Sequence, residues 1–163
     1  MIKPYTLVAG RITQEIAELE TVCSRAEQAI SAAKRNPADQ DFYMDSAALS
    51  LHDWYSGLER IFHFIASRLE ENVPQGHEWH RELLQQMQLD VAGVRPPVLS
   101  QQAVSRLDEY LRFRHVLRNV YSFNLQPERI EALVSSLGNT YGLVKAELMQ
   151  CAEFLEKLSR ADE

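Results

Sequence analysis

Residues 137–158 read LGNTYGLVKAELMQCAEFLEKL, and this stretch decides the fold class. Its apolar residues are separated by alternating gaps of four and three, at positions 137, 141, 144, 148, 151, 155 and 158. This period places them along one face of an α-helix, as is typical of a helix in a bundle. Pro127 suits the first position of such a helix. The sequence therefore predicts a long final helix that begins at residue 127.

The same helical period recurs in two earlier segments. Residues 5–35 carry an apolar stripe made of Ile12, Ile16, Leu19, Cys23, Ala26 and Ile30. Residues 37–71 carry a second stripe made of Ala47, Leu51, Trp54, Leu58, Ile61, Ile65 and Leu69. Asn36 is the predicted N-cap of the second helix, with Pro37 as its first residue. Both segments are therefore predicted to be long amphipathic helices.

The middle of the chain is less regular. Residues 72–76 are predicted to form a turn, and residues 77–87 a short helix. Residues 91–99, which contain two adjacent prolines, form the longest irregular segment, and Ser100 is the predicted N-cap of a helix that reaches Tyr121. The prediction is an all-α fold, an antiparallel bundle of four long helices and one short helix, in a single domain spanning residues 1–163. Gly57, Gly138 and Gly142 are predicted to let neighbouring helices approach closely.

Composition narrows the function classes. The chain has a net charge of −6 and a pI near 5.4, which argues against a broad nucleic-acid-binding surface but permits one focused anion site. No apolar run resembles a signal peptide or a membrane span, so we expect a cytoplasmic protein without membrane association. Cys23 and Cys151 lie in apolar helical registers, which favours buried free thiols over a disulfide.

Residues 112–121 read RFRHVLRNVY and stand out on this acidic chain. On a helix, Leu107 and Tyr110 begin a stripe that continues through Arg114, Arg118 and Tyr121. One interpretation is a solvated face whose arginines pair with nearby carboxylates such as Asp108 and Glu109. The other is a phosphate site, because arginine binds phosphate with two parallel hydrogen bonds and keeps its charge.

Histidines elsewhere raise the alternative of a metal site. His52, Glu59 and His63 share one face of the second predicted helix, but a metal would need further ligands from other segments. His77 and His80 lack the spacing of a zinc-protease motif. We therefore predict neither a metal nor a cofactor, and we treat Glu59 as a carboxylate that orients Arg114 or Arg118.

The stretch 112–121 resembles the fourth-helix motif of HEPN-domain ribonucleases, and among them the HepT-like toxins of MNT–HepT toxin–antitoxin systems. That motif has an arginine followed, after a short spacer, by a histidine and then a tyrosine. In this sequence Arg114 takes the arginine position, Asn119 the histidine position and Tyr121 the tyrosine position, while His115 takes the polar position after the arginine. Residues 51–62 resemble the second helix of the same group, and the likeness spans residues 40–158. The departure from the family is Asn119.

The resemblance implies a metal-independent endoribonuclease that uses the 2′-hydroxyl of RNA as its nucleophile. Arg114, Arg118 and Arg112 would bind the RNA phosphate, and Asn119 would position a hydroxyl but cannot take a proton. His115 would then be a substitute base. The resemblance also implies a homodimer, and a minimal nucleotidyltransferase (MNT-like) antitoxin that attaches AMP to Tyr121.

Three hypotheses remain open at this point. The chain is an active HepT-like ribonuclease toxin, a catalytically weakened HEPN scaffold that binds RNA or a nucleotidyltransferase, or an unrelated helical adaptor. A cleavage assay separates the first two. The third predicts that Arg114 and Arg118 are both held in intramolecular salt bridges, with no open cleft.

Overall fold

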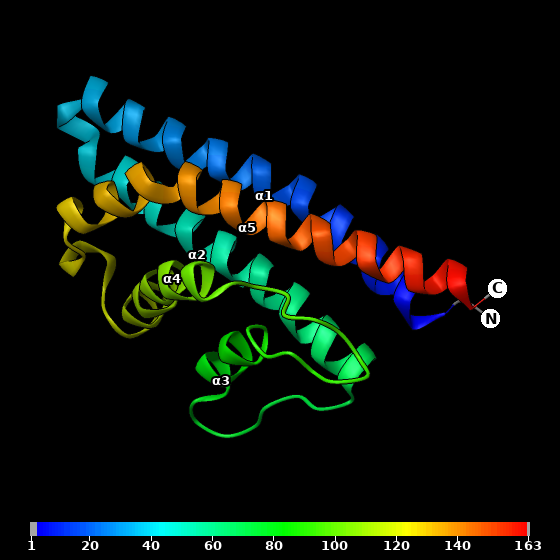
Figure 1. Ribbon diagram of the computed structural model, residues 1–163. Coiled ribbons are helices and arrows are strands. Elements are labelled where there is room, and N and C mark those ends of the chain that lie inside the picture. The colour runs from blue at the N-terminus through cyan, green and yellow to red at the C-terminus, as the bar shows by residue number, and fades with distance from the viewer. Residues whose placement is uncertain (1–2, 163) are drawn as a thin grey trace.

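The computed structural model describes residues 3–162 and is all-α (Figure 1). Its α-helices are α1 (Pro4–Arg35), α2 (Gln40–Ile65), α3 (Trp79–Gln86), α4 (Gln101–Asn119) and α5 (Pro127–Ala161). A 3₁₀ turn, Pro37–Asp39, precedes α2, a π-helical turn, Ala66–Glu70, follows it, and a 3₁₀ turn, Ser122–Asn124, precedes α5. The predicted bundle of four long helices and one short helix is confirmed. None of the helices in this part of the chain is long and apolar enough to cross a membrane.

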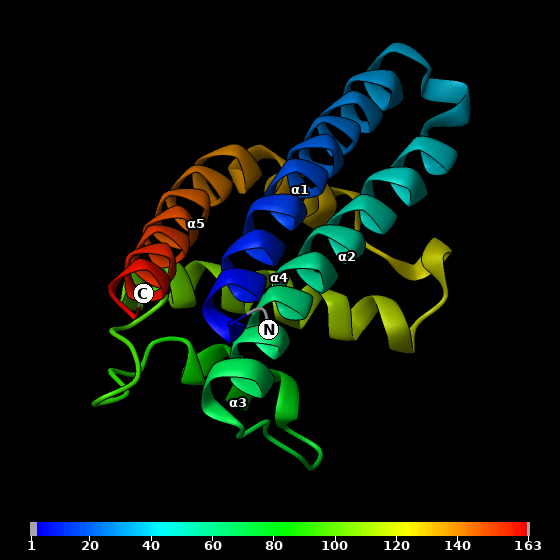
Figure 2. The ribbon, with the colours of Figure 1, turned by 90° about the vertical axis from the view of Figure 1, so that its right-hand side faces the viewer.

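The helices α1, α2 and α5 lie along one another and form the long body of the molecule, with α4 crossing them and α3 below α4 (Figures 1 and 2). The start of α1 meets the end of α5, where the Thr6 and Ser159 hydroxyls are 2.8 Å apart. Because α1 runs opposite to both α2 and α5, its apolar stripe is covered from two sides. All six predicted stripe residues of α1 are buried.

Trp54 stands at the centre of the core. Its ring makes edge-on contacts with Tyr110 of α4 at 5.0 Å and with Tyr141 of α5 at 6.2 Å between ring centroids. The Tyr110 hydroxyl donates to the Leu133 carbonyl and the Tyr141 hydroxyl to the Ile16 carbonyl, both at 2.7 Å. The rings therefore contribute apolar area while their hydroxyl groups stay hydrogen-bonded. The buried apolar side chains of all five helices form one cluster, and the assignment of residues 1–163 to a single domain stays a prediction.

The glycine predictions have mixed outcomes. A Cβ atom on Gly57 would lie 2.6 Å from Leu19 Cδ2, so Gly57 does allow α1 and α2 to approach closely. The prediction is wrong for Gly138 and Gly142. A Cβ on Gly138 would meet only the end of the Glu27 side chain at 3.8 Å, and one on Gly142 would meet nothing within 4 Å.

Two helix boundaries also differ from the prediction. The Asn36 side chain donates to the Ala32 carbonyl at 2.9 Å, so it closes α1 instead of capping the next helix. The short helix begins at Trp79 rather than His77. In contrast, Ser100 caps α4 as predicted, because its hydroxyl accepts from the Ala103 N–H at 3.1 Å.

A buried ion pair holds the irregular segment between α3 and α4. The Arg95 guanidinium pairs with Glu70 at the end of the π-helical turn and donates to the carbonyls of Leu89, Pro96 and Gln86 at 2.8, 3.1 and 3.0 Å. This network fixes the loop that sets the position of α3 against α4. The sequence-based prediction had described residues 91–99 only as irregular.

Candidate functional site

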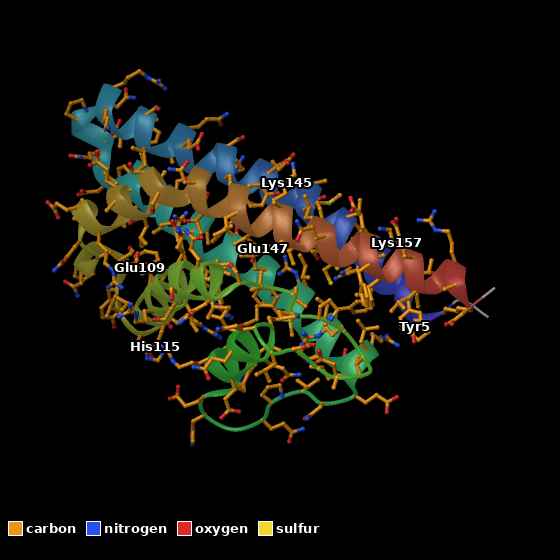
Figure 3. All side chains as sticks on the ribbon, in the orientation of Figure 1. Tyr5, Glu109, His115, Lys145, Glu147 and Lys157 are labelled. Carbon is orange, nitrogen blue, oxygen red and sulfur yellow. The ribbon has the colours of Figure 1, made fainter. Side chains whose placement is uncertain are left out.

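A cavity of about 510 Å³ lies between the start of α3, the second half of α4 and the start of α5. Five arginines line it: Arg81, Arg112, Arg114, Arg118 and Arg129. Its wall also contains His77, His80 and His115, and one carboxylate, Glu78. Figure 3 shows His115 at the lower edge of α4, on the side nearer to α3. A strongly cationic hollow on a protein of net charge −6 is the feature that an anion site requires.

The arginines of this cavity differ in how their charge is compensated. Asp108 pairs with both Arg81 and Arg112, the latter at 3.1 Å. Arg129 lies over the Phe113 ring at 5.7 Å. Within residues 3–162, Arg118 and Arg129 have no carboxylate partner, so they carry the uncompensated positive charge of the cavity.

Arg114 is held by Glu59, as the sequence had suggested. Arg114 Nη1 donates to Glu59 Oε1 at 2.8 Å, and the two side chains are 11% and 9% exposed. The Nε atom of Arg114 is buried and has no hydrogen-bond partner among the described residues. Arg114 is therefore mostly an internal residue that reaches the cavity wall, and Arg118 is the more accessible of the two.

Sequence reasoning missed the role of His80. Its Nδ1 atom lies 2.7 Å from Glu59 Oε2 and 3.4 Å from Arg114 Nη1. The Trp79 ring lies against the imidazole, with 3.5 Å between centroids and a tilt of 31°. Glu59 thus bridges Arg114 through one oxygen and His80 through the other. The sequence had placed Glu59 on one helix face with His52 and His63, whereas its hydrogen-bond partners in the structure are Arg114 and His80. No cluster of three or more potential metal ligands occurs among residues 3–162.

Tyr55, one helical turn before Glu59 on α2, is fully buried. Burial raises the pKa of its phenol, with the Glu59 carboxylate raising it further. The ring therefore stays neutral at physiological pH, and its hydroxyl has no hydrogen-bond partner among the described residues.

His115 and Asn119 lie one turn apart on the exposed side of α4, as the spacing predicts. Asn119 Nδ2 donates to the His115 carbonyl at 2.7 Å and lies 3.5 Å from His115 Nδ1. His115 lines the cavity, whereas Asn119 does not. The Asn119 amide satisfies one of the last carbonyl groups of the helix, which is a capping role.

Tyr121 does not share a helical stripe with Arg114 and Arg118, and that prediction is wrong. The helix ends at Asn119, because Val120 takes an extended conformation with φ −132° and ψ 158°. A β-branched residue favours such a conformation. The Tyr121 ring is 74% exposed and stacks on Phe123, with 5.5 Å between centroids and 4° between planes. It does not line the cavity.

The adaptor hypothesis predicted salt bridges for both Arg114 and Arg118 and no open cleft, and the structure agrees only for Arg114. Arg114 is indeed held in an intramolecular salt bridge, but Arg118 lacks one within the described chain and the cleft is open.

The comparison with protein families identifies the chain. The model of a family described as "HepT-like protein" matches residues 46–155, which is more than half of the chain and runs from Ser46 within α2 to Leu155 within α5. No characterised protein and no solved structure matches the chain. The chain therefore belongs to the HepT-like family of HEPN-domain proteins.

Proposed function

We propose that this HepT-like protein is a ribonuclease toxin that binds single-stranded RNA in the arginine-lined cleft and cleaves it without a metal ion. The observation that carries the proposal is the convergence of five arginines and three histidines on one cavity of an acidic protein. The remaining surface offers little attraction for nucleic acid, so binding would be confined to the few phosphates that reach the cleft.

The chemistry follows from the parts of the cleft. Attack by the 2′-oxygen on the adjacent phosphorus needs a base for the hydroxyl proton and a cation for the charge that develops on the phosphoryl oxygens. Arg118 and Arg129, whose charge is not compensated within the described chain, supply that cation, and Arg112 flanks them. Since arginine binds phosphate with paired N–H groups, the cleft suits a phosphodiester better than a carboxylate of similar size.

Binding and cleavage are tested separately. A mixed-sequence RNA and its 2′-O-methyl counterpart are offered to the protein in EDTA, with binding measured by fluorescence anisotropy over a series of salt concentrations. We expect the protein to cleave the RNA strand but not the 2′-O-methyl strand, and to bind both strands with an affinity that depends on the salt concentration. Arg118→Ala should make the plot of log affinity against log salt shallower by about one unit, since one phosphate contact is lost.

The matched control is Arg35→Ala, which removes an exposed arginine at the far end of α1. It should leave the salt dependence unchanged. Equal effects of the two substitutions, or cleavage of the 2′-O-methyl strand, would contradict the proposed site and chemistry.

A second candidate function is supported by Asn119 and Arg114. Asn119 stands where the family has a histidine, and Arg114 is already bound to Glu59. A HEPN scaffold that binds RNA or a nucleotidyltransferase without cleaving would have both features. RNA bound in the cleft but left intact in the experiment above would favour this function.

We also propose, from family membership, that the chain is a cytoplasmic homodimer and that a minimal nucleotidyltransferase acts as its antitoxin. The exposure of Tyr121 supports the second part, because an AMP-transferring enzyme needs access to the phenol. Sedimentation equilibrium at tens of micromolar should give twice the chain mass, and a monomer under those conditions would contradict the dimer.

A further inference from the structure

We propose that His80 is the catalytic base of the cleft, and that its Nε2 atom takes the proton from the 2′-hydroxyl. This inference rests on the proposed function and assigns the step that Asn119 cannot perform, since an amide does not accept a proton at neutral pH. His80 belongs to α3, whereas the residues that the sequence had suggested for this role belong to α4.

The first argument is the hydrogen bond that sets the tautomer of His80. Glu59 Oε1 accepts from the Arg114 guanidinium at 2.8 Å and forms a salt bridge with it. The other oxygen, Oε2, lies 2.7 Å from His80 Nδ1, whereas Arg114 Nη1 lies 3.4 Å from the same nitrogen, so the shorter contact with the carboxylate assigns the hydrogen to Nδ1. With the proton of the neutral ring on Nδ1, the lone pair is on Nε2, which is free to act as a base.

The second argument is that the imidazole is held in place. The Glu59 carboxylate is 9% exposed and anchored by Arg114, so it gives Nδ1 a fixed partner. The Trp79 ring covers one side of the imidazole at 3.5 Å between centroids. His80 is still 26% exposed and lines the same cavity as Arg118 and Arg129. A base positioned by a buried carboxylate beside a phosphate site is the arrangement that general-base catalysis requires.

The third argument is the contrast with the other histidines of the cavity. His115 is exposed, and its nearest polar partner among residues 3–162 is the Asn119 amide at 3.5 Å. His77 is exposed and precedes α3. Neither ring has a carboxylate partner in the described chain of the kind that Glu59 provides for His80.

The step balances as follows. His80 Nε2 takes the 2′-hydroxyl proton while O2′ forms a bond to phosphorus and the bond from phosphorus to O5′ breaks. The leaving O5′ takes a proton from the imidazolium or from water, and in the second case the imidazolium returns its proton to solvent. The products are a 2′,3′-cyclic phosphate and a 5′-hydroxyl.

The test uses His80→Asn in the full chain. The asparagine amide can donate to Glu59 as Nδ1–H does, but it cannot accept the proton. We expect the single-turnover cleavage rate to fall by about 10²–10⁴-fold, the range of a general base, while affinity for the 2′-O-methyl strand stays within about threefold. His63→Asn is the matched control, because His63 is exposed on α2 and does not line the cavity, and it should keep the wild-type rate within a few-fold.

Chemical rescue separates catalysis from structure. His80→Ala should regain cleavage when free imidazole is added, whereas Arg118→Ala should not. A wild-type rate in His80→Asn, or a loss of cleavage in His115→Asn alone, would overturn the role of His80 and leave the ribonuclease proposal standing. If the wild-type protein binds RNA without cleaving it, both the ribonuclease proposal and this assignment fall.

Discussion

Two carboxylates of the second helical segment form buried ion pairs with arginines far along the chain. Glu70, in the π-helical turn that continues α2, pairs with Arg95, and the two side chains are 5% and 1% exposed. Glu59, in the last third of α2, pairs with Arg114. The pairs have the same chemistry, but the groups around them differ.

The Glu70–Arg95 and Glu59–Arg114 pairs differ in how many of their hydrogen-bonding groups have a partner. Arg95 donates to three backbone carbonyls as well as to Glu70, and Gln86 also donates to Glu70. Arg114 Nε has no partner among residues 3–162 and the side chain reaches an open cavity, and Glu59 has a histidine on its second oxygen. An ion pair whose groups are all hydrogen-bonded holds the surrounding backbone in place. An ion pair with unpartnered groups beside a cavity keeps those groups available for a ligand.

Substituting Arg95 should have the largest effect on stability. Arg95→Met leaves the Glu70 carboxylate buried without its guanidinium and removes the donors from three carbonyls. We expect the free energy of unfolding to fall by about 3–5 kcal/mol, as for other buried pairs that lose one partner. Urea unfolding followed by circular dichroism measures this loss.

The control is the double variant Glu70→Leu, Arg95→Met. Removing both charges should recover a large part of the loss, because no buried charge is left unpaired. RNA cleavage per folded molecule should fall far less in the double variant than in Arg114→Met, because the Glu70–Arg95 network affects the cleft only through the position of α3. A comparable fall in cleavage would show that the two networks are not separate in function.

Arg114→Met should have a smaller effect on stability and a large effect on cleavage. Glu59 would keep His80 as its partner, so we expect a loss of about 1–3 kcal/mol, the cost of one unsatisfied buried group. Cleavage should fall by more than 10²-fold, because the cavity loses a cation and Glu59 loses the residue that anchors it. Urea unfolding and single-turnover kinetics on the same samples give both numbers.

Arg114→Lys tests whether stability and cleavage depend on the positive charge at residue 114 or on the planar guanidinium. It keeps the charge but not the planar guanidinium, so it should restore most of the stability and only part of the cleavage rate. If the cleavage rate of Arg114→Met falls only in proportion to its unfolded fraction, the Glu59–Arg114 pair is a structural device like Glu70–Arg95, and the contrast between them is wrong.

The helices were predictable because their signal is local and repeated. Each long helix carries an apolar stripe of several turns, and most residues of the stripes in α1, α2 and α5 are buried as the period predicts. The exceptions are Leu69, Cys151 and Leu158, which are only half-buried, so the prediction of a buried thiol holds for Cys23 and is wrong for Cys151. Gly57 was identified correctly, but Gly138 and Gly142 were not, because a glycine pattern does not reveal which face meets another helix.

The site was predictable only in part. The arginines of α4 were found because three of them fall within seven residues. The Glu59–His80 contact depends on the position of α3, which is set by the loop before α3 and by the buried Arg95 in the loop after it. No local sequence pattern encodes that position. Tyr121 was misplaced by extending the helical period past Asn119, where the backbone of Val120 leaves the helix.

Tyr121 belongs to neither ion-pair network, and substituting it should have the smallest effect on the isolated protein. The ring is exposed and stacks on Phe123, and Phe in its place preserves that stacking. We expect Tyr121→Phe to change the free energy of unfolding by less than about 0.5 kcal/mol, as for other surface substitutions, and to leave the cleavage rate within about twofold.

The effect of Tyr121→Phe should appear only in the presence of the proposed partner. Co-expression with the cognate nucleotidyltransferase should add AMP to the wild-type chain, measured by intact mass, and Tyr121→Phe should remove the adduct, whereas Tyr43→Phe, at a half-buried tyrosine of α2, should keep it. Because Tyr121 lies outside the cavity, the attached phosphate would have to block RNA by charge and bulk at the end of α4. An adduct that persists in Tyr121→Phe, or one that forms on Tyr121 without reducing cleavage, would contradict this control mechanism.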